Sequence, residues 1–363
     1  MRAQTLVFSF AFAAAAASIA ACGGGGGGSS PGGGGGVVPT PAPTATPTLT
    51  PTTVSGTVVQ IPSDAYGPVT MGTATYASTD ATQTTALVGA TVIVGPVPVI
   101  GATAPATLPS GDVSTTTSSA GAFSVSVLVA PAAPSTAEPF VIPSNNILAI
   151  TPPATGYYVE VFSVGTDGKS AGEPIPLHRF VAAGTSIALH VSSTSTAEAG
   201  ALTALNNDRS SNNNAGPLTF DESAEEVARL HASDEATAAY FCHYDTHNVG
   251  PSSRYLATGG IGLTGEAISS IVGPSSTSIA FTDAENAFIA EKTQSPVGGH
   301  YLNLVDTAHL WAGLAVATVP NSTPTAYDVD YDLITPSAQD TVVGSSGYPI
   351  ANTCPAGTTD NNS

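Results

Sequence analysis

Cys22 is the first residue of the chain whose setting suggests a chemical modification. An apolar run from Leu6 to Ala17 follows Arg2, and it fits the hydrophobic part of a secretory signal but is short for a membrane span. The residues Ile19-Ala20-Ala21-Cys22 that follow have the pattern of a bacterial lipobox, with the small residues Ala20 and Ala21 directly before the cysteine. A thiol at this position can take a diacylglycerol group, so we predict a signal peptide over residues 1–21 and lipidation of Cys22. The alternative is an ordinary signal peptide with an incidental cysteine.

Two further cysteines, Cys242 and Cys354, remain after such processing. A secretory signal delivers the chain to an oxidising compartment, in which disulfides form and persist. The even count favours one bridge between these two thiols, and closing so long a loop would stabilise the fold by about 3–5 kcal/mol. The alternative is a pair of free thiols, with Cys242 packed as a small apolar residue.

The histidines and aspartates carry no sequence motif of a hydrolase, since neither a nucleophile elbow nor an HExxH motif occurs. His178 and His190 stand alone in β-rich sequence, so we expect them to be structural or solvated. Asp328, Asp330 and Asp332 alternate in the run YDVDYD, which places all three on one face of a strand. That face could hold calcium, but no glycine-turn calcium loop surrounds it, and a solvated face is the expectation.

The overall composition excludes several classes of function. The 363-residue chain has 7 Lys and Arg against 26 Asp and Glu, a formal net charge of −19. So acidic a chain gains no counterion-release energy from phosphates, which argues against nucleic acid as a partner, and it offers no polybasic segment to anionic lipid. Charged residues make up only 9% of the chain, and the 38 Gly and 29 Pro favour β structure, loops and disordered stretches.

Residues 22–52 have the composition of a tether. The glycine-rich part that follows Cys22 is a flexible coil, and the Pro/Thr-rich part after it is stiffer and extends by about 3 Å per residue. Neither part has the apolar residues that a core needs. We therefore predict a disordered N-terminal tether between the membrane and the folded part of the chain.

Residues 53–192 show the alternation that is typical of half-buried strands. Apolar side chains recur at every second position in Phe123–Val129 and Tyr157–Phe162, and β-rich runs occur at Val54–Val59 and Ala86–Val94. This pattern predicts an all-β domain, a small antiparallel sandwich of carboxypeptidase-regulatory-like or immunoglobulin-like type. The order VSGTVV, LVGATVIV and TTTSSAGAFSVSV resembles the carboxypeptidase-regulatory-like modules of bacterial surface proteins. We expect this domain to be a spacer or an adhesive scaffold.

Helical signals appear in the C-terminal half of the chain. The run EAGALTALNNDRS at 198–210 predicts a first helix, and Thr219–Glu222 and Thr282–Glu285 have the capping-box pattern that opens a helix. Strands are expected at Leu314–Thr318 and Ala326–Leu333. Helices and strands in one continuous region predict an α+β fold.

Five segments of this region together resemble the CAP superfamily, which includes cysteine-rich secretory proteins, antigen 5 and pathogenesis-related proteins. They occur in the family's order and read LTALNNDR, GPLTFDESAEEVARLHASDEA, YFCHYD, GEAIS and VGGHYLNLVDTAHLWAGLAVA. Each segment alone is a weak signal, whereas the five in order are specific. The resemblance covers about residues 198–335 and implies an α-β-α sandwich, so we place an SCP-like CAP domain at 193–335 and an irregular tail at 336–363.

The resemblance also implies a cleft that holds two histidines and two glutamates. It assigns these roles to His243 in a Phe-x-His segment, Glu266 in a Gly-Glu pair, and His300 in a Gly-His pair. The fourth is Glu291, which lies three residues after the aromatic Phe288. The family usually has Trp in place of Phe288 and Asn directly after the Gly-Glu pair, where this chain has Ala, so the surroundings of its cleft differ.

Such a set of side chains could bind a divalent metal ion. Two imidazoles offer neutral nitrogen ligands to zinc or a similar ion, and nearby carboxylates can accept the other ring N–H and fix the tautomer. Two histidine ligands leave coordination positions for water, which a carboxylate could activate as a general base. The alternative is a polar hydrogen-bonded cluster that stabilises the fold.

We therefore predict a lipoprotein of the bacterial cell envelope, held outside the cytoplasm at the outer membrane or cell surface. Its CAP domain is expected to bind a divalent ion or an extracellular ligand such as a lipid, a glycan or a protein. The sequence has neither a nucleophile motif nor a complete three-ligand zinc motif. We therefore favour binding over the alternative, a metal-dependent hydrolase or peptidase that uses the four residues. A purely structural, adhesive role is the third possibility.

Three other histidines of the C-terminal half lie outside this set. We expect His231 to pack or cap a helix, although it matches a common family histidine. His247 and His309 are expected to be solvated or to lie close to the site without forming part of it.

Overall fold

The computed structural model describes most of the sequence between residues 51 and 336, in the ranges 51–63, 69–71, 74–76, 84–128, 156–182, 186–246 and 249–336. The predicted signal peptide, Cys22, His247 and Cys354 lie outside the described residues. No helix within these ranges has both the length and the apolar character that a membrane span needs.

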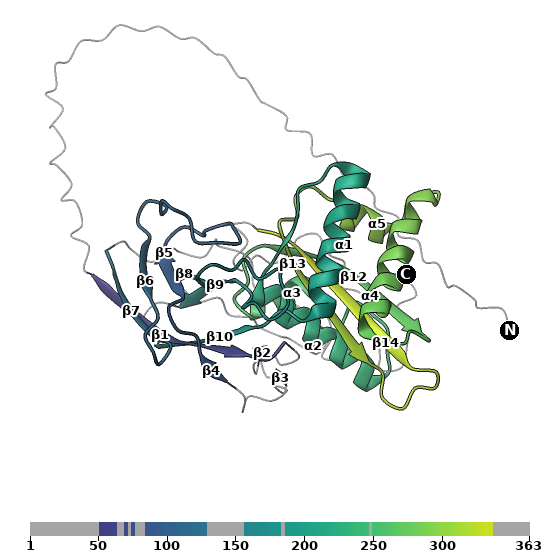
Figure 1. Ribbon diagram of the computed structural model, residues 1–363, viewed down its shortest axis with the longest axis horizontal. Coiled ribbons are helices and arrows are strands. Elements are labelled where there is room, and N and C mark those ends of the chain that lie inside the picture. Colours follow the sequence, from purple (N-terminus) through teal and green to yellow (C-terminus); the bar gives the residue numbers. More distant parts are fainter. Residues whose placement is uncertain are drawn as a thin grey trace, which may run out of the picture.

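The N-terminal half of the described chain is a sandwich of two four-stranded sheets (Figure 1). In one sheet, β1 (Thr52–Ile61) pairs with β4 (Thr85–Ala86), β7 (Ala122–Val127) and β10 (Ser186–Ser192). The other sheet has the order β6 (Val113–Thr116), β5 (Thr91–Gly95), β8 (Gly156–Phe162) and β9 (Leu177–Ala182). Side chains of both sheets meet in one core, among them Val58 and Phe123 from the first sheet and Val92 and Val159 from the second. A separate hairpin joins β2 (Val69–Met71) and β3 (Ala74–Tyr76).

One pairing differs from the antiparallel arrangement that the sequence predicts. β1 and β10 run parallel, with Ser55 opposite Ser186 and Ile61 opposite Ser192. A parallel pair needs a long crossover connection, and the intervening sandwich supplies it. The first and last strands of the sandwich are therefore hydrogen-bonded neighbours.

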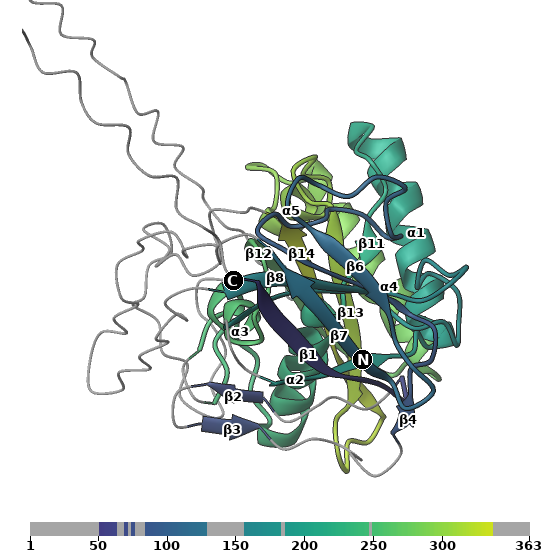
Figure 2. The same cartoon turned by 90° about the vertical axis from the view of Figure 1, so that its left-hand side faces the viewer.

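The C-terminal half is a three-layer α-β-α sandwich, as the resemblance implies. Its sheet has the order β11 (Thr219–Phe220), β13 (Trp311–Thr318), β14 (Ala326–Thr335) and β12 (Leu263–Val272). One face carries α1 (Thr196–Asn213), α4 (Thr277–Ala290), the short helix η1 (Glu291–Thr293) and α5 (Gly299–Leu304), and the other carries α2 (Glu222–Ala238) and α3 (Pro251–Ala257). Figure 2 shows the sheet between α2 and α3 on one side and α1 and α4 on the other.

β14 divides its side chains between the two helical layers. Every second residue packs with α1 and α4, namely Tyr327, Val329, Tyr331 and Leu333. The alternate residues Asp328, Asp330 and Asp332 are 3%, 0% and 0% exposed. The expectation of a solvated face is therefore wrong, because α2 covers that side of the strand.

Two predicted helix starts are also misplaced. Asp221 is the N-cap of α2 and its side chain accepts the N–H of Ala224, because Thr219 belongs to β11. α4 begins after the N-cap Ser276, so Thr282 lies inside the helix and not at its start. In both places a residue closer to the true first turn offers the capping oxygen.

The two halves of the described chain share a buried apolar cluster. Tyr158 and Phe180 of the sandwich pack with Trp311 and residues of the C-terminal half, namely Ala224, Val227, Tyr255, Ile261 and Ile334. The ring of Trp311 stacks on the ring of His178 from β9, with centroids 4.2 Å apart. His178 Nδ1 also lies 2.8 Å from Asp221 Oδ2. His178 is thus a structural histidine at the junction between the halves.

Glu285 of α4 gives the folded state a measurable dependence on pH. Burial and the neighbouring carboxyl of Asp208 raise the pKa of Glu285 to about 8, from an ordinary value of 4.5. Between these values the folded state binds a proton that the unfolded state releases. Glu285 should therefore lower the free energy of unfolding as pH rises through this window, and its own contribution is at most about 1.4 kcal/mol per pH unit.

Chemical denaturation at a series of pH values measures this slope. Glu285→Gln should reduce it, while Asp283→Asn, at an exposed position of the same helix, should leave it unchanged. A slope that persists unchanged in Glu285→Gln would assign the proton to another group.

Candidate functional site

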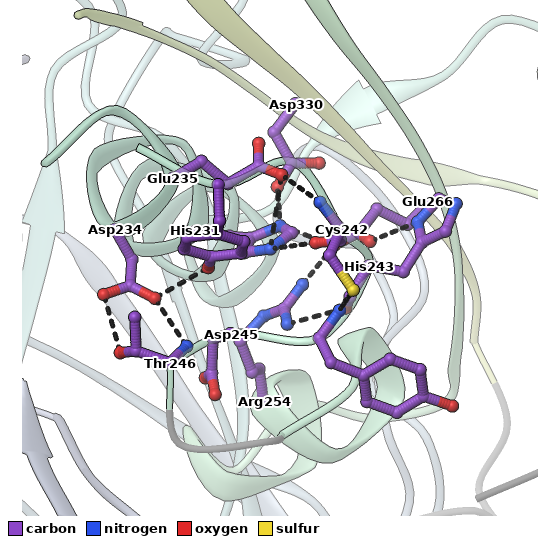
Figure 3. Close-up of polar contacts among 12 residues, drawn as sticks. His231, Asp234, Glu235, Cys242, His243, Asp245, Thr246, Arg254, Glu266 and Asp330 are labelled. Carbon is purple, nitrogen blue, oxygen red and sulfur yellow. Dashed lines mark hydrogen bonds and ion pairs between the residues drawn. The ribbon is translucent and has the colours of Figure 1, made fainter. Parts of the chain in front are cut away.

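His243 lies in the segment after α2 and contacts Glu266 of β12. Its ring Nδ1 is 2.7 Å from Glu266 Oε2, and the two side chains are 19% and 1% exposed. An ionised carboxylate only accepts hydrogen bonds, so Nδ1 donates and the lone pair of the neutral ring is on Nε2. Figure 3 shows this pair beside the end of α2. A glutamate that holds Nδ1–H is the usual support of a histidine that binds metal through Nε2.

His300 of α5 makes the same kind of contact with Glu291. Its ring Nδ1 is 2.8 Å from Glu291 Oε1, and its backbone N–H donates to Glu291 Oε2 at 3.0 Å. The ring of Phe288 lies 4.8 Å from the imidazole, centroid to centroid. A Cβ added at Gly298 would lie 2.3 Å from Glu291 Oε2, so this close approach requires a glycine. Each predicted histidine is therefore bonded to one predicted glutamate.

The two pairs reach β12, the edge strand of the sheet, from different sides. Glu266 is opposite Asp332 in the strand register and lies on the face covered by α2. His300 belongs to α5, which packs on the α4 side. The elements are in contact, because a Cβ at Gly265 would lie 2.0 Å from Asn303 Oδ1. β12, which carries Glu266, and α5, which carries His300, are thus in contact at this edge of the sheet.

His231 of α2 is at the centre of a buried polar cluster behind Glu266. Its Nδ1 is 2.9 Å from Asp330 Oδ2 and 3.1 Å from Glu266 Oε1, and its Nε2 is 2.9 Å from the carbonyl oxygen of Cys242. Within the described part of the chain, the potential metal ligands that lie within 4.8 Å of one another are His231, Glu266 and Asp330. This group shares only Glu266 with the four predicted residues.

The protons of this cluster follow from its hydrogen bonds. Since a carbonyl only accepts, His231 Nε2 donates to Cys242, and Nδ1 of the neutral ring must accept. Burial and the nearby charge of Arg254 lower the pKa of His231. Burial and the charges of Glu266 and Asp332 raise the pKa of Asp330 well above its ordinary value. Asp330 is therefore the protonated partner and donates to Nδ1.

Arg254 of α3 supplies the positive charge of the cluster. It is fully buried, its Nη2 donates to Glu266 Oε1, and its Nη1 donates to the carbonyls of His243 at 3.1 Å and Val249 at 2.6 Å. Burial raises the pKa of Glu266, but the ion pair with Arg254 and the bond from His243 lower it well below its ordinary value. A metal ion at the His231 group would meet this guanidinium, so the group is a hydrogen-bonded support for Glu266.

A scan against protein-family models matched residues 202–327 to CAP, the cysteine-rich secretory protein family. Residues 202–327 form a CAP domain. All four residues that the resemblance singles out lie within the matched range, and the three-layer fold agrees with it. A search of the curated proteins and a search of the solved structures each found no match.

Side chains of α2 hold the segment of the CAP domain that carries His243. Glu235 Oε1 accepts the N–H of Cys242 at 3.0 Å. Asp234 accepts hydrogen bonds from the N–H and the hydroxyl of Thr246, at 2.8 and 2.9 Å (Figure 3). The segment is thus fixed to the helix at both of its ends.

Cys242 and His309 each have a buried place in the CAP domain. Cys242 is 0% exposed and takes part in a disulfide, but Cys354 lies outside the described residues, so the Cys242–Cys354 bridge stays a prediction. His309 is 7% exposed and bonds Asn303 and Thr335, and burial lowers its pKa to about 4. It is buried near α5 and is not solvated.

The sequence analysis did not assign four residues of this CAP domain site to it: His231, Glu235, Arg254 and Asp330. Glu235 and His231 lie four residues apart and so share one face of α2, and the alternation of β14 puts Asp330 on a defined face. These spacings show in the sequence which residues share a face, but they do not show which other element packs against that face. Arg254 had no such signal, because its contacts depend on how α3 packs against β12 and the His243 segment.

Proposed function

We propose that the CAP domain binds a divalent metal ion, zinc or a similar ion, through His243 and His300. The observation that supports this is the bond from each ring's Nδ1 to a glutamate, at 2.7 Å for Glu266 and 2.8 Å for Glu291. In both rings the lone pair is then on Nε2, and the carboxylate makes that nitrogen a stronger ligand. With two histidine ligands, zinc keeps positions for water or for a group of an extracellular lipid, glycan or protein.

Binding is favoured over the alternative function, a metal-dependent hydrolase or peptidase. A general base must take up a proton near neutral pH. Arg254 and the bond from His243 hold the pKa of Glu266 well below its ordinary value against the effect of burial, so this carboxylate is a weak proton acceptor. Glu266 can therefore orient the ring of His243, but it is a poor group for activating water.

Calorimetric titration of the whole chain with zinc tests the proposal. The whole chain is used because the sandwich and the CAP domain share a buried cluster. We expect one zinc per chain, no binding in His243→Ala or His300→Ala, and about 10- to 100-fold weaker binding in Glu266→Gln or Glu291→Gln.

His190→Ala is the matched control, because this partly buried histidine of the sandwich also bonds a glutamate, Glu226, at 3.1 Å. It should leave zinc binding unchanged. Equal losses in the control and in the site variants would mean diffuse attraction to the acidic surface. Full binding in His300→Ala would contradict the shared site.

We also infer that a lipid on Cys22 anchors the chain to the bacterial cell envelope, with the CAP domain outside the cytoplasm. The apolar run from Leu6 to Ala17 and the small residues before Cys22 support this inference. The predicted tether over residues 22–52 would let the CAP domain extend away from the membrane. The net charge of −19 disfavours electrostatic binding to anionic lipid, so attachment to the membrane would depend on the lipid on Cys22. The same charge argues against nucleic acid as a partner.

A further inference from the structure

The guanidinium of Arg254 interacts with His243 both directly and through Glu266. Its Nη1 donates to the backbone carbonyl of His243 at 3.1 Å, and its Nη2 donates to Glu266 Oε1. The other oxygen of Glu266, Oε2, lies 2.7 Å from the ring Nδ1 of His243. The guanidinium thus fixes the backbone of His243 directly and its ring through the carboxylate.

The geometry of these contacts requires an arginine. Nη1 serves a second carbonyl, that of Val249, at 2.6 Å, so one planar group holds two backbone oxygens and one carboxylate. A guanidinium offers five donors in a fixed fork, whereas a lysine offers a compact charge on a flexible stem. A lysine could face Glu266 but could not keep the same three partners in place.

Arg254 is itself held rigidly, because α3 is fastened to its surroundings. The neighbouring Tyr255 is 0% exposed and packs in the cluster around Trp311. The N–H of Phe180, from the sandwich, donates to the carbonyl of Gly259 just after α3 at 2.8 Å. A rigid donor on a fixed helix can set the position of the groups it contacts.

We propose that Arg254 is a positioning residue that keeps the His243 ring in the Nδ1–H form, with Nε2 turned to the ligand. The proposal rests on the proposed function only in naming Nε2 as the metal ligand. Without the guanidinium, Glu266 loses the donor that fixes Oε1, and the carbonyl of His243 loses its hydrogen bond from Arg254 Nη1. The carboxylate can then turn, and the ring samples both tautomers.

Nitrogen NMR of the whole chain, labelled with 15N in its histidines and free of metal, tests this directly. Long-range proton–nitrogen correlations distinguish the two tautomers, and His243→Ala identifies the signal. We expect the Nδ1–H form in the unaltered chain and a mixture of forms in Arg254→Gln and in Arg254→Lys. Zinc binding, measured by calorimetry, should weaken by about 10- to 100-fold in both.

Arg229→Gln is the matched control, because this buried arginine binds Glu198 and Glu225, both at 3.0 Å, and not Glu266. It should leave the His243 spectrum unchanged. The Lys variant keeps the charge, so it provides the answer if the Gln variant does not fold. An unchanged tautomer in the folded Arg254 variants, or an equal change in the control, would overturn the proposal.

The two readouts separate this proposal from the metal site. A chain that binds no zinc, while its Arg254 variants still change the His243 tautomer, would reject the metal function and support the positioning role. Zinc binding by the unaltered chain, with an unchanged tautomer and affinity in the Arg254 variants, would reject the positioning role alone.

Discussion

Replacing Trp311 with alanine should lower the free energy of unfolding by about 3–5 kcal/mol. Trp311 is 1% exposed and packs between residues of the sandwich and of the CAP domain, with its ring stacked on His178. Its removal leaves a cavity at the junction and takes an apolar surface from both halves. We therefore expect both halves of the chain to become less stable together.

Urea denaturation followed by circular dichroism measures this loss. The chain has a single tryptophan, so the tryptophan fluorescence of the unaltered protein reports on the junction itself and should change with the main transition. Val272→Ala, at a β12 position that is 65% exposed, is the control and should change stability by less than about 0.5 kcal/mol. A similarly small effect of Trp311→Ala would refute the packed junction.

Replacing Cys22 with serine should move the protein out of the membrane fraction. In the proposed anchor this thiol is the group that takes the lipid, and each buried CH₂ of a lipid chain contributes about 0.8 kcal/mol to membrane binding. Without it, the chain should be soluble or remain unprocessed. Cell fractionation, detergent extraction and mass spectrometry of the mature N-terminus check the result.

Cys354→Ser is the matched control, because it removes a thiol that should carry no lipid, and it should stay with the membrane. An unaltered chain that is soluble and carries no lipid would contradict the anchor. The same outcome would leave the zinc experiments untouched, since they concern the CAP domain alone.

The fold could be predicted from the sequence where one local pattern decides the structure. Strand alternation and helical spacing gave the α+β class, and the strands expected at Leu314–Thr318 and Ala326–Leu333 lie within β13 and β14. The CAP domain was recognised because five short segments keep the family's order, and the family model confirms it. These signals are short-range or ordered along the chain, so they need no knowledge of tertiary contacts.

The errors have one physical cause, which is that tertiary contacts decide what a face or a cap meets. The alternation of Asp328, Asp330 and Asp332 gives a common face, but only the position of α2 makes that face buried. Thr219 has a capping-box pattern, yet it is drawn into β11 by pairing with Trp311. Likewise, no spacing places Arg254 beside Glu266.

The parallel pairing of β1 and β10 has a mechanical consequence. Tension applied to the chain before Thr52 pulls β1 toward its N-terminus, while β10 continues past Ser192 into the CAP domain and pulls the opposite way. The two strands are then loaded in shear along their shared register, from Ser55 opposite Ser186 to Ile61 opposite Ser192. In this direction the hydrogen bonds of the ladder carry the load together and cannot open one after another, so the strand pair resists the force as a unit.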